Sequence, residues 1–523
     1  MSRFFNTAGP CDPAKHYMLL PESRLPRVRS LIDRELYFVV HAPRQTGKTT
    51  TFEHLARSLT AQGRYAALHA SCETGQVAGG DVERGVGAVL QAITLAAELQ
   101  LPPELRPAPL EEFVSVVAEG RLAFFLSHWT RKSDRPVVLF LDEIDALRDE
   151  ALLSVLRQLR SGYSGRPAGF PQSLALIGLR DVRDYKARIR SDSESLGTSS
   201  PFNIKVESLT LRNFNADEVA ELYAQHTEET GQVFLAEAVA RAYELTRGQP
   251  WLVNALARQM VEEIVPDPKV AIETSHVERA KEILIERRDT HLDSLIDRLR
   301  EARVRRVLEP ILAGELISPD MLEDDIQFVR DLGLIAPGPA GIEIANPIYR
   351  EVIPRALAWV TQISLPISQA PYITADGLLD TDRLLADFQA FWCQHAEFYL
   401  SRQPYSEAAA QLIFMAYLQR VVNGGGSIER EYAVGSGRID LCVRWPHRSG
   451  VQHWAIELKV WRAGRPDPLA EGLSQLSGYL VRLGLDRGTL ILFDGRSTAV
   501  AAPERCARSE VEHEGRRLTV LRL

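Results

Sequence analysis

The chain has 523 residues, which is too long for one hydrophobic core and predicts three or four domains. Its formal net charge of −8 excludes a protein coated in basic surface, so any nucleic-acid contact must be confined to local patches. No apolar run reaches the roughly 18 residues that a membrane span needs, and residues 1–10 hold no apolar signal core. We therefore expect a cytoplasmic protein with no membrane partner.

The cysteines do not form a recognisable pattern. They show neither C-x-x-C spacing nor pairing with histidines, so they support neither a disulfide framework nor a zinc site. We expect reduced, structural thiols at Cys11, Cys72, Cys393, Cys442 and Cys506.

The N-terminal 36 residues lack a regular pattern until Arg24–Arg34, which predicts a helix. The pair His16-Tyr17 and the turn Gly9-Pro10 allow two interpretations. They could form an aromatic wall for a purine base, or a turn that packs against the core. The second interpretation is favoured.

A strand-to-helix loop follows at Tyr37–Thr50, which reads Y-F-V-V-H-A-P-R-Q-T-G-K-T-T. The apolar run predicts a buried parallel strand, and the residues after Lys48 have helical spacing. In a phosphate-binding loop, backbone N–H groups face the phosphates, a lysine reaches the β- and γ-phosphates and a hydroxyl coordinates magnesium. Ala42 replaces the usual first glycine, which is tolerated if its φ is negative. The alternative is a basic turn that contains the residues G-K-T by chance and does not bind a nucleotide. The predicted nucleotide-binding residues here are Ala42, Gln45, Thr46, Gly47, Lys48, Thr49 and Thr50, with Thr49 also a magnesium ligand.

A second motif strengthens the prediction of a nucleotide site. The stretch Val137–Asp145, V-V-L-F-L-D-E-I-D, is an apolar strand that ends in acids. Asp142 would hold the Mg²⁺ shell, and Glu143 would orient or deprotonate the attacking water. Other strands are predicted at Tyr65–Ser71, Ser173–Leu179 and Phe202–Leu209, with helices at Val82–Leu99, up to Trp129 and at Ala151–Leu159. Strands that alternate with helices predict a parallel α/β sheet with its ligand at the carboxyl ends of the strands.

The two motifs and the strand that follows the acidic one resemble the AAA+ and related signal-transducing ATPases, over roughly the first 260 residues. In that family the polar residue at the end of the following strand senses the γ-phosphate, which implies Arg180 here. Arginine replaces the usual Asn or Thr. A salt bridge from Arg180 to Asp181 or Asp184 is therefore an equal alternative.

From about Asn215 the pattern becomes helical, with predicted helices at Ala216–His226, Leu235–Leu245 and Leu252–Val265. The turn Gly248-Gln249-Pro250 resembles the G-x-P turn in the lid of the signal-transducing branch, where it lies near the nucleotide. A plain helix-breaking turn is the alternative.

The next segment combines a charged helix with a helix–hairpin unit. Glu286–Arg306 predicts one amphipathic helix, and its interspersed acids favour a solvated face over a DNA-binding ridge. Met321–Leu334 predicts a helix, and a hairpin at residues 335–345 and a helix at Ile348–Val360 follow it. This unit resembles a winged helix. Ser364–Thr381 is rich in Pro, Ser and Gly, which is typical of a linker.

Beyond the linker, helices are predicted at Asp382–Leu400 and Ser406–Val422, and strands at Glu431–Val443 and Val451–Val460. Asp440 lies on the first strand. Glu457 and Lys459 lie two residues apart on the second, so they share a face. A charged pair in an apolar strand is costly to bury, which favours a functional role.

Asp440 followed by Glu457-x-Lys459 resembles the PD-(D/E)xK nuclease superfamily, over roughly residues 400–497. The resemblance implies that Asp440 and Glu457 hold a divalent metal while Lys459 acts on the attacking water. Gln475 and Tyr479, on a predicted helix at Leu469–Leu483, match a Q-x-x-x-Y helix of one branch. Glu407 matches an acidic position in the preceding helix, and a strand at Thr489–Phe493 closes the core. The alternative is a salt-bridged set in which the two acids pair with Lys459 and Arg438.

The sequence thus predicts a multidomain α/β protein. The expected boundaries are 1–210 for the P-loop ATPase core, 211–285 for a helical lid, 286–362 for a winged helix, 363–381 for a linker and 382–523 for a restriction-endonuclease-like α/β domain. We expect an ATP- and Mg²⁺-dependent ATPase, forming a homo-oligomer, that controls a nuclease acting on nucleic acid, with DNA as the favoured form and Mn²⁺ as an alternative nuclease metal. By analogy of architecture, this suits genome defence or mobile-element control. An oligomeric scaffold that binds nucleic acid without cutting is the main alternative, and a DNA-translocating motor ranks last.

Overall fold

The computed structural model describes residues 3–20, 23–179, 205–287, 290–312, 322–338, 341–364, 372–400, 409–422, 426–434, 437–462, 464–496 and 506–523. The chain forms two compact units. The first unit comprises residues 1–291 and 327–336, and the second comprises residues 292–326 and 337–523. Within the ranges given above, no helix is long and apolar enough to cross a membrane.

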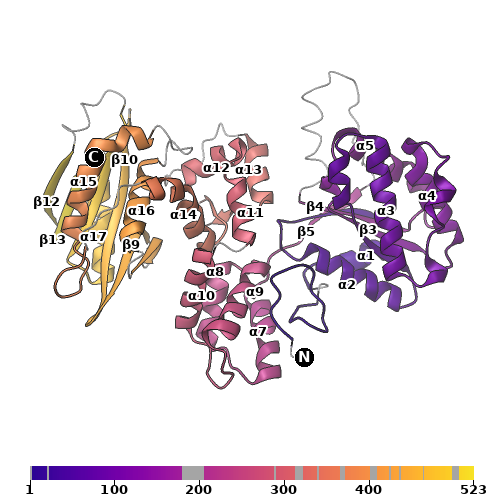
Figure 1. The fold of residues 1–523 in the computed structure, drawn as a ribbon, viewed down its shortest axis with the longest axis horizontal. Helices are drawn as coiled ribbons and strands as arrows, with labels where there is room; N and C mark the ends of the chain where they lie inside the picture. Colours follow the sequence, from indigo (N-terminus) through magenta and orange to yellow (C-terminus); the bar gives the residue numbers. More distant parts are fainter. Residues whose placement is uncertain are drawn as a thin grey trace. The chain divides into compact units, whose positions relative to one another are not determined.

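The first unit is built around a five-stranded parallel sheet (Figure 1). Its strands are β1 (Tyr37–His41), β2 (Ala66–Ser71), β3 (Val137–Asp142), β4 (Ser173–Gly178) and β5 (Lys205–Thr210). The order across the sheet is β2-β3-β4-β1-β5, so β1 lies beside β4 and the acidic strand β3 lies between β2 and β4. The five predicted strands are therefore confirmed. The near-continuous apolar runs of β1 to β4 are typical of parallel strands that are covered on both faces, whereas the edge strand β5 reads K-V-E-S-L-T.

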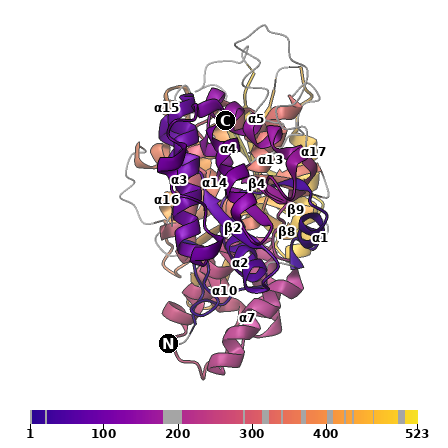
Figure 2. The ribbon, with the colours of Figure 1, turned by 90° about the vertical axis from the view of Figure 1, so that its right-hand side faces the viewer.

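Helices cover both faces of this sheet. One face packs against α1 (Val28–Asp33) and α2 (Lys48–Ala61). The other packs against α3 (Val82–Gln100), α4 (Ala118–Lys132) and α5 (Asp149–Ser161). Figure 2 shows α2 and α3 on either side of β2. The result is a three-layer α/β core whose strand ends carry the predicted motifs.

A helical segment follows the sheet. It contains α7 (Ala216–Thr230), α8 (Ala236–Thr246), α9 (Pro250–Arg258), a π-helical turn (Gln259–Ile264) and α10 (Thr274–Arg287). Asn215 and Glu218 form a reciprocal capping box at the start of α7, and Gly231 ends that helix in the left-handed conformation that glycine tolerates. The three helices predicted between Ala216 and Val265 are thus present.

The N-terminal segment packs against these helices. Tyr17 is 1% exposed, and its ring contacts the rings of Phe5 and His226. A ring so enclosed cannot stack on a base. The segment is therefore a turn packed against the core. The interpretation of Tyr17 as part of an aromatic wall for a purine base is wrong.

The predicted single helix at Glu286–Arg306 is wrong. The segment contains the end of α10, then α11 (Thr290–Arg298) and the start of α12 (Ala302–Leu312). Residues 299–301 form a turn at which the helical pattern breaks. Arg303 and Arg306 form ion pairs with Asp325, and Arg298 pairs with Glu301. Asp325 is buried, so its pairs with Arg303 and Arg306 are packing contacts, whereas the partly exposed pair of Arg298 and Glu301 agrees with the predicted solvated face.

A helix and a small hairpin follow. They are α13 (Glu323–Asp331), β6 (Ile335–Gly338) and β7 (Gly341–Ile344), and α14 (Pro347–Ser364) comes next. The element order matches the one predicted, with the helix starting two residues late. Residues 327–336 belong to the first unit, where a Cβ at Gly333 would lie 2.8 Å from the ring of Pro43. α14 packs within the second unit, mainly against α16.

The second unit contains a six-stranded mixed sheet with the order β12-β13-β11-β10-β9-β8. Its strands are β8 (Ser427–Val434), β9 (Gly437–His447), β10 (Gly450–Trp461), β11 (Arg487–Asp494), β12 (Ala507–His513) and β13 (Arg516–Arg522). β8, β9 and β10 form an antiparallel meander, whereas β11 runs parallel to β10 after a helical crossover. Helices α15 (Thr381–Leu400) and α16 (Ala409–Val422) pack on one face, and α17 (Leu469–Leu483) packs on the other.

Three expectations about this unit need correction. The predicted strand Glu431–Val443 is the junction of β8 and β9, because the chain reverses after Val434. Residues 372–380, expected in the linker, pack onto the unit: Tyr372 is buried, and the Gly377 carbonyl accepts a hydrogen bond from Trp445. Strands β12 and β13 were not predicted.

The expectation of reduced cysteines is also wrong for one pair. Cys393 on α15 and Cys506, just before β12, form a disulfide across 113 residues of sequence. Such a separation leaves no spacing pattern to read, and disulfides are uncommon in a reducing cytoplasm. Cys11, Cys72 and Cys442 remain free thiols.

Candidate functional site

The loop between β1 and α2 has the geometry of a phosphate-binding loop. Gly47 has φ of 87°, which favours glycine, and α2 begins at Lys48 directly after it. Gln45 also has a positive φ, whereas Ala42 does not, so the departure from glycine at Ala42 costs no backbone strain. The loop therefore presents a helix N-terminus at the carboxyl end of a parallel strand, where anions bind.

Lys48 is held inside the loop. Its ammonium donates hydrogen bonds to the carbonyl oxygens of Ala42 at 2.9 Å and Pro43 at 3.0 Å. Burial lowers the pKa of Lys48, although Glu143, Asp142 and Asp145 oppose that change. The carbonyl oxygens carry no full charge, so a phosphate would be a stronger partner for this ammonium.

Thr49 and Asp142 meet across the site, as the magnesium prediction requires. The Thr49 hydroxyl donates to Asp142 Oδ2 at 2.7 Å. Burial would raise the pKa of Asp142, but hydrogen bonds from His69 and Thr49 outweigh it and hold that pKa below its usual value. An ionised carboxylate beside a hydroxyl is a set of hard oxygen ligands suited to Mg²⁺.

Two further acids lie next to Asp142. Burial is the main cause that raises the pKa of Glu143, with a further contribution from Asp145. Glu143 adopts a left-handed conformation with φ of 51°. Asp145 is half-buried, desolvation raises its pKa, and its enclosed Oδ1 atom has no hydrogen-bond partner within the described part of the chain. A carboxylate with a raised pKa beside the metal position is suited to accept a proton from water.

The remaining predicted loop residues have structural partners. The Thr46 hydroxyl donates to the Pro43 carbonyl, and the Thr50 hydroxyl accepts the N–H of Cys11. The lid turn contacts the loop, since Gln249 donates to the Gln45 carbonyl at 3.4 Å. Arg180, Asp181 and Asp184 lie outside the described residues.

Two residues of this site were not predicted. His69, within β2, lies 3.1 Å from Asp142 Oδ2 through its Nε2 atom. Arg24 is 7% exposed and donates to the Thr46 carbonyl at 2.8 Å and to the Arg212 carbonyl at 3.0 Å. Neither residue belongs to a sequence motif. The strand order that places β2 beside β3 is the signal that could have indicated His69.

The second predicted constellation lies on the α17 face of the other sheet. Asp440 on β9 accepts the backbone N–H of Leu458 at 2.8 Å, which places its carboxylate beside β10. Glu457 is 3% exposed, and the Lys459 ammonium lies 3.3 Å from its Oε1 atom. The structure therefore brings together all three predicted residues.

The electrostatics of this cluster are unusual. Burial, and then the neighbouring charge of Asp440, raise the pKa of Glu457 to about 8. Its Oε2 atom is buried without a hydrogen-bond partner among the described residues. Burial lowers the pKa of Lys459, but Glu457 and Asp440 more than offset this and raise it. The carboxylates of Asp440 and Glu457 therefore lie close together, and one Glu457 oxygen lacks a hydrogen bond within the described ranges. This arrangement is suited to a bound cation.

The predicted accessory residues divide into three cases. Gln475 donates to Glu471 at 3.2 Å, and Glu471 lies 3.7 Å from the Lys459 ammonium, so Gln475 reaches the lysine through one carboxylate. Tyr479 packs against the apolar cluster between α17 and the sheet. Glu407 lies outside the described residues. Within the described ranges, no group of three or more His, Cys, Asp or Glu side chains has the arrangement of a metal site.

No family model matches the chain, and no curated protein matches it in sequence. Among solved structures, the chain is similar to a Walker-type ATPase of Pyrococcus abyssi, PABY2304, with 13% identity, 67% of this chain and 99% of that chain covered and a TM-score of 0.45. It is also similar to the Thermotoga maritima RuvB Holliday junction branch migration motor (16% identity, 64% and 93% covered, TM-score 0.34). A third is Cdc6p of Pyrobaculum aerophilum (14% identity, 66% and 96% covered, TM-score 0.37).

Similarities at these TM-scores carry no argument about function. The fold is indicated by the structure itself. The evidence is the strand order, the left-handed Gly47 before α2 and the contact between Thr49 and Asp142. The first unit has a three-layer α/β fold with the geometry of a phosphate-binding loop after β1.

Proposed function

We propose that the first unit binds and hydrolyses ATP with Mg²⁺, and that its nucleotide state controls a metal-dependent nuclease in the second unit. The substrate would be a nucleic acid, with DNA as the expected form, and the working assembly a homo-oligomer. The observation that carries the proposal is the presence of two separate, pre-arranged acid–lysine sites, one in each unit.

In the ATPase site, Lys48 would leave the carbonyls of Ala42 and Pro43 to contact the β- and γ-phosphates. Thr49 and Asp142 would hold Mg²⁺, directly or through water, and Glu143 would accept a proton from the attacking water.

In the nuclease site, Asp440 and Glu457 would hold the metal, which would stabilise charge on the scissile phosphate and activate a water. A cation between these acids would lower the pKa of Glu457, because it favours the ionised form. Lys459 cannot be a ligand while it is protonated, so it would act on the water or on the phosphate. The α/β topology supports this assignment: a meander is followed by a helix and a fourth strand parallel to the third, and the three residues lie on the adjacent strands β9 and β10.

A cleavage assay tests the nuclease assignment. Linear, circular and single-stranded DNA, and RNA, would be incubated with the full chain and Mg²⁺ or Mn²⁺, with and without ATP. Asp440→Ala and Glu457→Ala should each remove cleavage while ATP hydrolysis continues. The matched control is Asp376→Ala, an exposed acid of the same unit. A lower melting temperature with unchanged cleavage in both variants would contradict the assignment.

A second candidate is an ATP-dependent scaffold that binds nucleic acid without cutting. The ion pair between Lys459 and Glu457, with no three-ligand cluster in the described ranges, favours it. The two candidates differ in their metal response. Nucleic-acid binding that persists in Asp440→Ala, with no cleavage by the parent under any metal, would establish the scaffold.

A further inference from the structure

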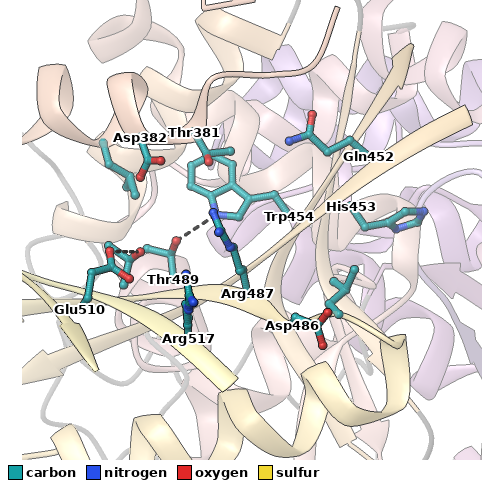
Figure 3. A pocket seen from close by; sticks show the side chains of 14 residues that line it. Thr381, Asp382, Gln452, His453, Trp454, Asp486, Arg487, Thr489, Glu510 and Arg517 are labelled. Carbon is teal, nitrogen blue, oxygen red and sulfur yellow. Dashed lines mark hydrogen bonds between the residues drawn. The ribbon is translucent and has the colours of Figure 1, made fainter. Parts of the chain in front are cut away.

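The second unit contains a cavity that the two sites above do not use. Its volume is about 740 Å³, and it lies where the first residues of β10 and β11 meet β12, β13 and the start of α15 (Figure 3). Trp454 lines this cavity and belongs to the core cluster with α15, whereas Ala455 belongs to the cluster with α17. Because side chains alternate along a strand, Glu457 and Lys459 point to the α17 face. The cavity and the carboxylate cluster are therefore on opposite faces of one sheet.

Two arginines stand side by side in this cavity. Arg487 on β11 and Arg517 on β13 are direct partners in the parallel register (Figure 3). Both are exposed, and across the described residues neither side chain has an ion pair or a hydrogen bond. Like charges opposite each other on neighbouring strands are destabilising. An anion that bridges the two guanidinium groups would remove that repulsion and use their parallel N–H donors.

Most other polar groups of the cavity are already satisfied. Trp454 donates to the Thr489 hydroxyl at 2.9 Å, and the Thr519 hydroxyl donates to Glu510 at 2.8 Å. Asp382 forms an ion pair with Arg508. Arg487 and Arg517 are the arginines that line the cavity, and acids surround them.

The surrounding acids decide what kind of anion fits. Asp382, Asp486 and Glu510 line the same cavity and would repel the successive phosphates of a nucleic-acid strand. They would accept hydrogen bonds from hydroxyl groups. The volume lies within the range of roughly 300–1,000 Å³ that is usual for small-molecule sites.

We infer that this cavity binds a small phosphate monoester, with Arg487 and Arg517 holding the phosphate and the acids facing the hydroxyl groups of the ligand. The phosphate dianion matches two guanidinium charges. The site is independent of the proposed ATPase and nuclease activities.

Calorimetric titration of the full chain with ribose 5-phosphate tests this inference. Saturating ADP and Mg²⁺ would occupy the P-loop beforehand, so that any further binding reports another site. We expect saturable binding that Arg487→Ala and Arg517→Ala each weaken about tenfold or more, because each variant removes a charge-assisted hydrogen bond. Ribose without phosphate should not bind, and inorganic phosphate should compete.

Arg465→Ala, at an exposed arginine outside the cavity, is the matched control and should bind as the parent does. Without ligand, Arg487→Ala should keep or raise the melting temperature, since it removes a like-charge pair. Three outcomes would overturn the inference: no saturable binding of ribose 5-phosphate, equal binding by both arginine variants, or an arginine-dependent preference for a 5′-phosphorylated oligonucleotide over ribose 5-phosphate.

Discussion

At the scale of single residues, Lys48 is the most direct test of the ATP site. Lys48→Ala removes the ammonium that would meet the β- and γ-phosphates, while Gly47 and α2 keep the loop in place. We expect ATP affinity to fall by about tenfold for each charge-assisted hydrogen bond that the substitution removes, measured by calorimetry. Lys132→Ala, at an exposed lysine that ends α4, should bind ATP normally. Undiminished binding in Lys48→Ala would refute the site.

Glu143 should separate binding from hydrolysis. Glu143→Gln keeps the shape and can keep the left-handed backbone, but an amide cannot accept the proton of the attacking water. ATP binding should persist while hydrolysis falls by about 10²–10⁴-fold, as is typical for the loss of a general base. Steady-state phosphate release and nucleotide affinity measure the two quantities. Hydrolysis at the parent rate would show that another group, such as Asp145, activates the water.

The buried Glu457 gives the second unit a specific pH dependence. Its folded pKa of about 8 lies above its ordinary value of 4.5, so the folded state binds more protons than the unfolded state between those pH values. Its contribution to stability is present below about pH 4.5 and is lost as pH rises through 8. Glu457→Gln should therefore raise the melting temperature most at pH 8 and above. A larger gain at pH 5 would contradict the raised pKa.

How far the sequence predicted these residues depends on whether a motif carried them. Lys48, Thr49, Asp142 and Glu143 were predicted, because a phosphate-binding loop and an acidic strand end have fixed spacings. Arg24 was not predicted, because its partners are backbone carbonyls far along the chain, and carbonyls leave no signature in sequence. The pairing of Cys393 with Cys506 could not be predicted because 113 residues separate them and leave no spacing pattern.

At the scale of elements, Arg24 joins three segments. Its guanidinium reaches the P-loop at Thr46, the segment after β5 at Arg212, and the ring of Phe214 at 4.8 Å. Burial lowers its pKa to about 10, which leaves it charged at neutral pH. These contacts fix the P-loop relative to the start of the lid.

Arg24→Ala should therefore loosen the loop. It leaves the Thr46 and Arg212 carbonyls without this donor, and we expect the free energy of unfolding of the first unit to fall by about 2–3 kcal/mol. ATP affinity should fall as well. The control is Arg27→Ala, which removes only an ion pair between exposed Arg27 and Glu207 and should cost less than about 1 kcal/mol. Chemical denaturation measures the free energy of unfolding of both variants, and nucleotide titration measures their ATP affinity. Equal losses in Arg24→Ala and Arg27→Ala would contradict the role of Arg24.

Elements with strong periodicity were predicted well. Strands β1 to β4 of the first sheet and the helix α17 have clear apolar patterns. The β8–β9 reversal was missed because Tyr432–Val434 and the residues after Gly437 both read as strand, and one continuous strand fitted the pattern equally well. The three-way split of residues 286–306 was missed because amphipathic spacing continues across the turn at residues 299–301.

At the scale of the whole molecule, the division into units predicts where the chain can be cut. A fragment that begins at Thr381 lacks Tyr372, whose hydroxyl donates to Asp387 and contacts Tyr417 at 3.0 Å, and it lacks α14, which packs on α16. Loss of the buried Tyr372 side chain alone should cost about 1.5–3 kcal/mol. A fragment that begins at Asn346 retains both features and should melt at a higher temperature than the one from Thr381.

The Asn346 fragment then isolates the control that the first unit exerts. It retains Asp440, Glu457, Lys459 and the Cys393–Cys506 disulfide, but no part of the P-loop. If nucleotide binding in the first unit shifts a two-state equilibrium, only the full chain can respond to ATP. Cleavage by the fragment should therefore be the same with ATP, ADP or no nucleotide, whereas cleavage by the full chain should change, and Lys48→Ala in the full chain should abolish that change. Equal nucleotide dependence in the fragment would mean that the second unit binds the nucleotide itself. Independence in the full chain would mean that the two sites are uncoupled.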